Sequence, residues 1–306
     1  MPEYAYATVD VFTVDRFGGN PLAIVSDARG LSDGQMQAIA AEFNYSETTF
    51  VLPPENRNNT ARVRIFTRTA EVPFAGHPNV GAGFFLGQQP TVFGAAVGST
   101  MRFEEQAGLV EVELLRDAGG AVAGASITAP GDLDIGERMD ATQLAKCLSL
   151  SPEGILTDHH APTLASVGLP FFLAQTDIDT LATASPNLDA MAAAVKEGRG
   201  DSRLRLAIFI YARKGAGIGD LRARMFAPLG GTFEDPATGS ASAALGAFLM
   251  SLDPRSDATE AIQIEQGVEM GRRSEIGVHV HKAYGRIESV RVSGRCVPVM
   301  CGTIEA

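Results

Sequence analysis

The sequence predicts a mixed α/β (α+β) protein of two similar domains, each with a curled sheet wrapped around a buried helix. Two observations carry this prediction. The chain has 306 residues, of which 45% are hydrophobic, so it can bury a substantial core and suggests two domains. One order of strand, loop and apolar helix also occurs in both halves, and an internal repeat defines an architecture more firmly than local propensity does.

The repeat begins with a strand in which charged and apolar residues alternate, the pattern of a half-buried strand. Its sequence is RVRIF at 62–66 and RARMF at 222–226. An apolar segment follows in each half, AGHPNVGAGFFL at 75–86 and TGSASAALGAFL at 238–249, and four of these twelve aligned positions are identical. Because all the parts come in the same order, we favour duplication over chance similarity.

Both apolar segments carry almost no charge, and a helix that is apolar all round must be buried on all sides. Short alternating or apolar runs surround each segment and predict strands. These runs lie at 7–12, 22–25, 48–52 and 110–115 in the first half, and at 163–167, 204–211 and 278–280 in the second. A curled sheet around a central helix satisfies both patterns.

More polar helices are expected on the outside of the sheets. Ser32 and Gln35 form a capping box, which marks the start of a helix. Apolar residues then recur at helical spacing: Met36, Ile39, Ala40 and Phe43. Asp140 with Gln143 begins a similar segment in the second half.

A break in the pattern divides the chain. Residues 118–121 (AGGA) are rich in Gly and Ala and show no periodicity, which is typical of a loop. We therefore expect one domain at 1–118 and another at 119–289. The last strand, near 290–306, is a candidate to return to the first domain.

Charge and composition exclude several classes of protein. The chain has 25 Lys plus Arg against 36 Asp plus Glu, a net charge of −11, which repels phosphate backbones and anionic lipids. Its longest apolar runs, at 80–86 and 241–250, are well short of the roughly 20 residues that cross a bilayer. No secretory signal is visible at the start. We expect a cytoplasmic protein without nucleic-acid or membrane partners.

The start of each apolar helix is a candidate site. His77 follows Gly76, and Ser240 follows Gly239. The first turn of a helix presents free N–H groups and a partial positive charge that bind carboxylate or phosphate, and glycines let a ligand approach the backbone. Pro78 fits the first helical position. If duplication sets the two helix starts face to face across a cleft, one small anionic ligand contacts both.

A simpler interpretation is that His77 and Ser240 are N-caps, a role that Ser fills often and His rarely. For Ser240 alone the cap is the favoured interpretation. For His77 a function is favoured, because a helix N-terminus disfavours imidazolium and keeps a neutral donor and acceptor available.

Two carboxylates are further candidates. Glu47 lies between a capped helix and an apolar strand, and Asp235 lies just before the second apolar helix. Either group could transfer a proton if it is partly buried. The alternatives are a solvated acid at a strand edge and an Asx-type turn before proline, and the residue pattern alone slightly favours these.

Other chemistry has little support. The three cysteines, Cys147, Cys296 and Cys301, form no CxxC pair, and their odd number argues against a disulfide framework. His279 and His281 would share one face of a strand, but no third ligand is near in sequence, so a surface strand is favoured over a metal site. Dinucleotide, P-loop and GxSxG motifs do not occur.

Several segments match the motifs of one family in the family's order, and together they cover nearly the whole chain. They are RFGGNPLA at 16–23, EFNYSET at 42–48, FAGHP at 74–78, EDPATGSA at 234–241 and QGVEMGR at 266–272. On these motifs the sequence resembles the PhzF-like family, which is named for an isomerase of phenazine biosynthesis.

The resemblance implies a diaminopimelate-epimerase-like fold. In that fold, two similar domains each form a curled, mostly antiparallel sheet or barrel around a central helix, with the active site in the cleft between them and usually a homodimer. The epimerases of this wider fold place a cysteine at each helix start, where this chain has His77 and Ser240. Racemisation by two thiols is therefore disfavoured.

The resemblance also implies a reaction on a small carboxylate. Glu47 would remove a proton from one carbon of a cyclic amino acid such as 2,3-dihydro-3-hydroxyanthranilate and return it to another. Asp235 would assist, and His77 and Ser240 would position the substrate. The same motifs imply substrate contacts by Asn20, Ser46, Gly76, Pro78, Thr238 and Gly239. Such acid/base chemistry requires no metal and no organic cofactor.

Two other functions remain open. A cofactor-free epimerase or dehydratase of a small amino acid could use the same cleft, because removal of a proton next to a carboxylate is the shared first step. A non-catalytic carboxylate-binding protein could retain the cleft without the reaction.

Overall fold

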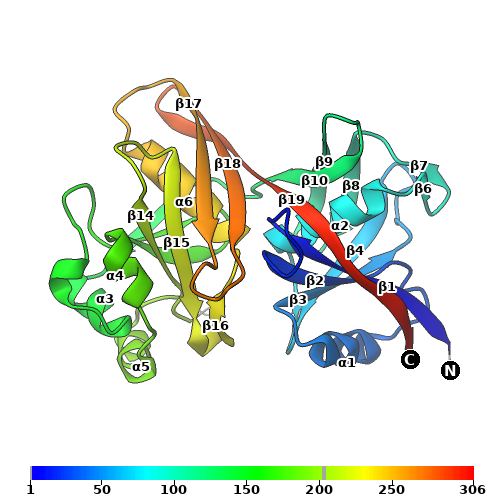
Figure 1. The fold of residues 1–306 in the computed structure, drawn as a ribbon, viewed down its shortest axis with the longest axis horizontal. Helices are drawn as coiled ribbons and strands as arrows, with labels where there is room; N and C mark the ends of the chain where they lie inside the picture. The colour runs from blue at the N-terminus through cyan, green and yellow to red at the C-terminus, as the bar shows by residue number, and fades with distance from the viewer. Residues whose placement is uncertain (1, 202–204) are drawn as a thin grey trace. The chain divides into compact units, whose positions relative to one another are not determined.

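The computed structural model describes residues 2–201 and 205–306, and the chain divides into two compact units. Unit 1 comprises Met1–Thr128 with Ser293–Ala306, and unit 2 comprises Ala129–Val292 (Figure 1). The Gly/Ala-rich stretch at 118–121 is the turn between two paired strands of unit 1, β9 (Gly108–Arg116) and β10 (Val122–Thr128). Leu204, at the start of the strand expected at 204–211, lies outside the described residues.

Unit 1 contains a closed barrel. In ring order its strands are β1 (Glu3–Val11), β2 (Asn20–Val25), β3 (Glu47–Leu52), β4 (Ala61–Thr67), β8 (Thr100–Glu105), β9, β10 and the second part of β19 (Arg286–Glu305). Each strand pairs with the next, and β19 pairs with β1 to close the ring. The β2–β3 and β4–β8 pairs are parallel. The short strand β5 (Glu71–Val72) pairs antiparallel with β4, and β6 (Thr91–Val92) pairs with β7 (Ala95–Ala96).

Helix α2 (Gly76–Gly87) runs through this barrel (Figure 1), and all of its residues except Phe85 and Gly87 are buried. Helix α1 (Asp33–Phe43) covers the outside of the barrel, where Met36 and Ile39 pack in one cluster with Phe50 and Phe66. The expected capping box of Ser32 and Gln35 is confirmed at the start of α1. The contrast between an apolar inner helix and a more polar outer helix follows the sequence pattern.

Unit 2 repeats the strand order of unit 1. Its strands are β11 (Asp134–Arg138), β12 (Thr163–Ser166), β13 (Pro170–Gln175), β14 (Ile208–Arg213), β15 (Asp220–Ala227), β16 (Thr232–Asp235), β17 (Ala258–Gln266), β18 (Ser274–Ala283) and the first part of β19. From β12 onward the pairs are antiparallel, parallel, antiparallel, parallel and antiparallel. The series from β1 to β9 has the same senses, so the common plan predicted from the repeat is confirmed.

Helix α6 (Gly239–Ser251) is the counterpart of α2 and is buried from Ala241 to Met250. The outer helices of unit 2 are α3 (Ala141–Cys147), α4 (Ile178–Thr183) and α5 (Leu188–Lys196), with 3-10 turns at Pro152–Gly154 and Pro228–Gly230. Asp140 caps α3, as expected, by accepting hydrogen bonds from the N–H groups of Thr142 and Gln143. No helix in residues 2–201 and 205–306 has both the length and the apolar character needed to cross a membrane.

Close packing explains one identity in the repeat. A Cβ atom at Gly83 of α2 would lie 2.5 Å from Val112 of β9, and a Cβ atom at Gly246 of α6 would lie 2.8 Å from Val278 of β18. Strands β9 and β18 hold the same place in the two units. Glycine at these positions therefore lets each inner helix approach the same wall of its sheet.

Candidate functional site

Unit 1 brings Glu47 and His77 together, although thirty residues separate them in sequence. Glu47 is the first residue of β3 and follows the end of α1, where Asn44 adopts a left-handed conformation. His77 is the second residue of α2. Its Nδ1 atom lies 3.5 Å from Oε2 of Glu47, and the two side chains are 6% and 20% exposed. Glu47 is therefore a half-buried carboxylate beside a buried imidazole.

The imidazole of His77 is neutral at physiological pH. Burial lowers the pKa of His77 to about 3, which agrees with the expectation of a neutral ring at this helix start. Its Nε2 atom is buried and has no hydrogen-bond partner among the described residues. The neutral ring can donate through one nitrogen and accept through the other, so it can hydrogen-bond both Glu47 and a ligand.

The first turn of α2 is not capped by a side chain. Its N-cap residue is Ala75, which offers no side-chain acceptor to the N–H groups of the turn. The hypothesis that His77 is itself the N-cap is therefore wrong. Pro78 is the third helical residue rather than the first, because the helix starts at Gly76. Free N–H groups at a helix start favour an anion.

Unit 2 builds a second polar cluster before α6. Asp235 ends β16 and is buried, and its Oδ2 atom accepts a hydrogen bond of 2.6 Å from the Thr238 hydroxyl. The N-cap of α6 is Thr238, so the hypothesis that Ser240 is a cap is also wrong. Ser240 is the second helical residue, as His77 is in α2, and is half-buried. The two helix starts thus carry one polar side chain each at the same position.

Gln266 forms hydrogen bonds with two residues of this cluster. The sequence analysis did not identify it as a site residue. Its Oε1 atom accepts from the Thr238 N–H at 3.0 Å, and its Nε2 atom donates to the Asp235 carbonyl at 2.8 Å. The next residue, Gly267, has a φ of +74°, and a Cβ atom there would lie 2.6 Å from the Pro236 carbonyl oxygen. Both residues lie in the QGVEMGR motif, which gave a sequence signal for the segment but not for the role of either residue.

The remaining predicted contacts lie near these two clusters in sequence, within one unit or the other. Asn20 is buried at the start of β2, and Ser46 is half-buried immediately before β3. Gly76 and Pro78 are buried in α2, and Thr238 and Gly239 are buried where α6 begins. Each unit therefore contains one cluster of the predicted site residues.

An arginine that is half-buried in unit 1 and buried in unit 2 anchors the strand before each helix start. In unit 1, Arg64 donates to both carboxylate oxygens of Glu71 on β5, each at 2.7 Å. In unit 2, Arg224 donates to both oxygens of Glu234 on β16 at 2.8 and 2.9 Å. These arginines are the third residues of the RVRIF and RARMF strands, so the repeat keeps a bidentate pair, which the alternation of charged and apolar residues did not reveal.

The other polar candidates lie away from the helix starts. His279 and His281 are exposed on β18, as expected for a surface strand. Among the described residues, no group of three or more His, Cys, Asp or Glu side chains could hold a metal ion. Burial raises the pKa of the Cys147 thiol to about 11 and raises that of Cys296 further, and Cys301 is exposed. None of the three is in α2 or α6.

A family model described as "Phenazine biosynthesis-like protein" matches residues 9–302. The chain belongs to the PhzF family. A trans-2,3-dihydro-3-hydroxyanthranilate isomerase from Pseudomonas fluorescens is 36% identical to it, and an uncharacterized isomerase from Mesorhizobium japonicum is also 36% identical, each match covering 98% of both chains. A PhzF-family crystal structure from Bacillus anthracis has a TM-score of 0.87 at 22% identity and covers 100% of both chains.

These relatives confirm the resemblance inferred from the motifs. The chain is an enzyme of the isomerase class, and it has the epimerase-like fold of the PhzF family. Its geometry adds a half-buried carboxylate next to a neutral histidine, and a helix start whose N-cap residue provides no side-chain acceptor. Such an arrangement can bind a carboxylate and can transfer a proton.

Proposed function

We propose that this PhzF-family isomerase moves a proton between two carbons of a small cyclic amino acid, such as 2,3-dihydro-3-hydroxyanthranilate, and that Glu47 is the acid/base. The observation that carries the proposal is the contact of 3.5 Å between Glu47 Oε2 and Nδ1 of the buried, neutral His77. A carboxyl group that is 20% exposed can meet a substrate, and its partial burial favours the exchange of a proton.

The uncapped first turn of α2 would bind the substrate carboxylate. Its N-cap residue, Ala75, provides no side-chain acceptor for the N–H groups of this turn, and the helix dipole favours negative charge there. The polar cluster of Asp235, Thr238 and Ser240 would act on the same substrate molecule. Asp235 would assist proton transfer, while Ser240 and the start of α6 would hold a second polar group of the ligand.

The proposed reaction conserves composition. The Glu47 carboxylate takes a proton from one ring carbon, and the electron pair of that C–H bond shifts through the adjacent double bonds. The same carboxyl group then returns the proton to another carbon. Glu47 must therefore exist in both protonation states during each turnover, which a group shielded from water supports.

The test follows 2,3-dihydro-3-hydroxyanthranilate in deuterated water by absorbance and mass spectrometry. The wild type should convert it with uptake of deuterium and with otherwise unchanged composition. Glu47→Gln keeps the size of the side chain but cannot accept a proton, so kcat should fall by about 10²- to 10⁴-fold. Glu42→Gln, which changes an exposed carboxyl of α1, is the matched control and should keep full activity.

Other outcomes identify the competing functions. Loss of water from the substrate would indicate a dehydratase, and deuterium uptake without a shift of the double bonds would indicate an epimerase. Binding without conversion by the wild type, with equal affinity for Glu47→Gln, would indicate a carboxylate-binding protein and would overturn the proposal.

A further inference from the structure

The repeat relates Glu105 in unit 1 to Gln266 in unit 2. In the β4–β8 pair, Arg62 lies opposite Glu104. In the β15–β17 pair, Arg222, the counterpart of Arg62, lies opposite Glu265. The residue that follows Glu104 therefore occupies the position of the residue that follows Glu265, so Glu105 takes the place of Gln266.

The role of Gln266 requires both a donor and an acceptor. Its amide accepts from the Thr238 N–H and donates to the Asp235 carbonyl. An ionised glutamate can only accept hydrogen bonds, whereas a protonated carboxyl group, like an amide, can donate one and accept another. Glu105 can therefore perform the same task in unit 1 only in its neutral form.

Among the described residues, no hydrogen-bond donor is paired with the Glu105 carboxyl group. Asn79 is fully buried in the first turn of α2, and its Nδ2 atom donates to the Ala75 carbonyl at 3.0 Å. Its Oδ1 atom and both carboxyl oxygens of Glu105 are buried without a hydrogen-bond partner among the described residues. Three buried acceptors without a donor are costly. A proton on Glu105 would turn one of them into a donor.

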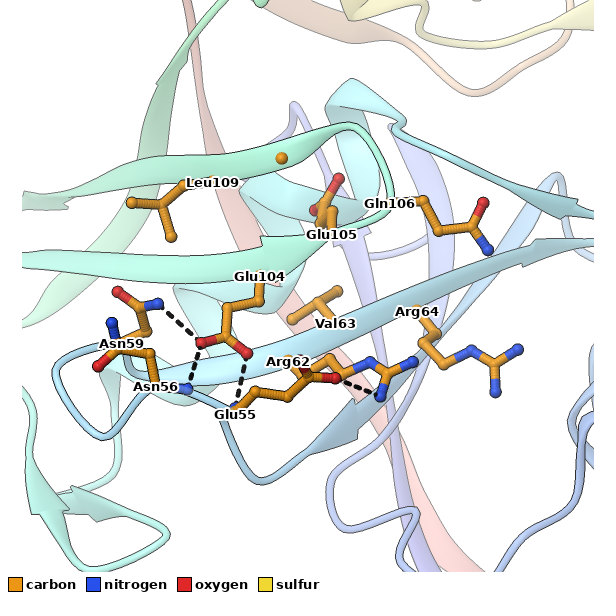
Figure 2. A pocket seen from close by; sticks show the side chains of 11 residues that line it. Glu55, Asn56, Asn59, Arg62, Val63, Arg64, Glu104, Glu105, Gln106 and Leu109 are labelled. Carbon is orange, nitrogen blue, oxygen red and sulfur yellow. Dashed lines mark hydrogen bonds and ion pairs between the residues drawn. The ribbon is translucent and has the colours of Figure 1, made fainter.

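The charged neighbours of Glu105 form ion pairs and hydrogen bonds with other residues. Figure 2 shows the pocket of about 470 Å³ that Glu105 lines with Arg62, Arg64 and Glu104. Arg62 pairs with Glu55, and Arg64 pairs with Asp33 and Glu71. Glu104 accepts hydrogen bonds from the backbone N–H groups of Glu55 and Asn56 and from the side-chain amide of Asn59. Among the residues that the structure describes, neither arginine forms a hydrogen bond with Glu105.

His77, the titratable side chain in the first turn of α2, is neutral. The charged groups of the pocket thus leave the anion of Glu105 uncompensated. Burial raises the pKa of Glu105 to about 8, and the neighbouring Asn79 amide offsets part of this rise. The carboxyl group is therefore mostly protonated at neutral pH.

We propose that Glu105 is a positioning residue that works as a neutral carboxylic acid, donating its proton to Oδ1 of Asn79 and so holding the first turn of α2, and with it His77, in place. When the pH rises and Glu105 ionises, its carboxyl group can no longer donate a hydrogen bond, so this turn loosens. The consequence for catalysis depends on the proposed function, whereas the positioning itself does not.

The experiment measures the intact protein without substrate. Carbon-13 NMR of glutamate-labelled protein follows each carboxyl carbon from pH 4 to 10, and amide hydrogen exchange follows residues 80–83 from pH 6.5 to 9.5. In the wild type, one carboxyl carbon should titrate near pH 8, and protection of 80–83 should fall roughly tenfold between pH 7 and 9, after correction for intrinsic exchange.

Two variants separate this role from a general structural one. Glu105→Gln should lose the high titration and keep protection constant over the same pH range, because its amide supplies a permanent donor. Glu104→Gln changes the neighbouring carboxyl, which bonds Asn56 and Asn59 instead, and should retain both effects.

The proposal is overturned if no glutamate of the folded wild type titrates above about pH 6.5, which needs no variant at all. It is also overturned if Glu105→Gln keeps the pH dependence of the wild type, or if Glu104→Gln abolishes it. None of these measurements uses turnover, so failure of the isomerase proposal would leave them unchanged.

Discussion

Burial governs the protonation of His77 more strongly than the neighbouring carboxylate does. A negative charge on Glu47, 3.5 Å away, would favour imidazolium. Removal of the ring from water and the positive end of α2 both oppose it. Since the pKa of His77 is lowered to about 3, the opposing effects win, and His77 meets a ligand as a neutral hydrogen-bonding group.

The pKa of His77 predicts a dependence of stability on acid. The unfolded chain binds a proton near the ordinary pKa of 6.5, whereas the folded protein resists protonation until about pH 3. Above pH 6.5 this group therefore does not change the free energy of unfolding. As the pH falls from 6.5 to about 3, the free energy of unfolding decreases by up to about 1.4 kcal/mol per pH unit.

We expect His77→Gln, which cannot titrate, to unfold at a lower pH than the wild type in an acid titration followed by circular dichroism. His279→Gln, on the exposed face of β18, should unfold at the wild-type pH. An unchanged acid midpoint for His77→Gln would show that His77 is protonated normally in the folded state.

The sequence could predict the identities of these residues but not all their contacts. Glycine and a polar residue at the start of an apolar helix pointed to His77 and Ser240, and the motifs pointed to Glu47. Gln266 and Glu105 were not predicted, because their role depends on which residues lie opposite each other in two parallel strand pairs, β4–β8 and β15–β17. Spacing along the chain does not encode this register.

At the scale of elements, Arg64 and Arg224 each connect a long strand to the short strand before a helix start. Arg224 on β15 holds Glu234, the residue before Asp235, on β16. Its remaining nitrogen donates to the carbonyls of Leu181 and Ala184 at the end of α4. One side chain therefore links β15, β16 and α4, and it positions the strand that carries Asp235.

Replacement of Arg224 should lower the free energy of unfolding. Arg224→Met keeps much of the side-chain volume but leaves Glu234, which is 11% exposed, without its partner, and breaking such a buried pair costs about 3 to 5 kcal/mol. Arg62→Met removes a pair in which Arg62 is 44% and Glu55 is 75% exposed, and should cost less than about 1 kcal/mol.

Urea unfolding together with hydrogen exchange at β16 measures both effects. Equal losses for Arg224→Met and Arg62→Met would contradict a positioning role for the buried pair. The sequence alone did not reveal this difference, because both arginines belong to similar alternating strands, and β5 and β16 are too short to show a strand pattern.

At the scale of the whole molecule, the chain closes unit 1 with its last residues. β1 pairs with β19 from Glu3 opposite Glu305 to Val11 opposite Cys296, and β19 also pairs with β10. Gly294 lies against the buried ring of Phe12, where a Cβ atom would be 2.2 Å from the ring. A barrel that lacks one strand exposes two unpaired edges and part of its core.

Deletion of residues 293–306 should therefore unfold unit 1, because these residues form a strand of its barrel. Ala129–Val292 is continuous in sequence and forms a compact unit of its own, so its amides should keep their protection in hydrogen exchange while those of unit 1 lose theirs. Deletion of residues 305 and 306 alone, which removes only the end of the β1–β19 pairing, is the control and should preserve both units. Because the missing strand is a single segment, a peptide of residues 293–306 should restore protection to unit 1. If unit 1 stays protected without this strand, closure of the barrel contributes little to its stability, and the α2 core alone keeps Glu47 and His77 in place.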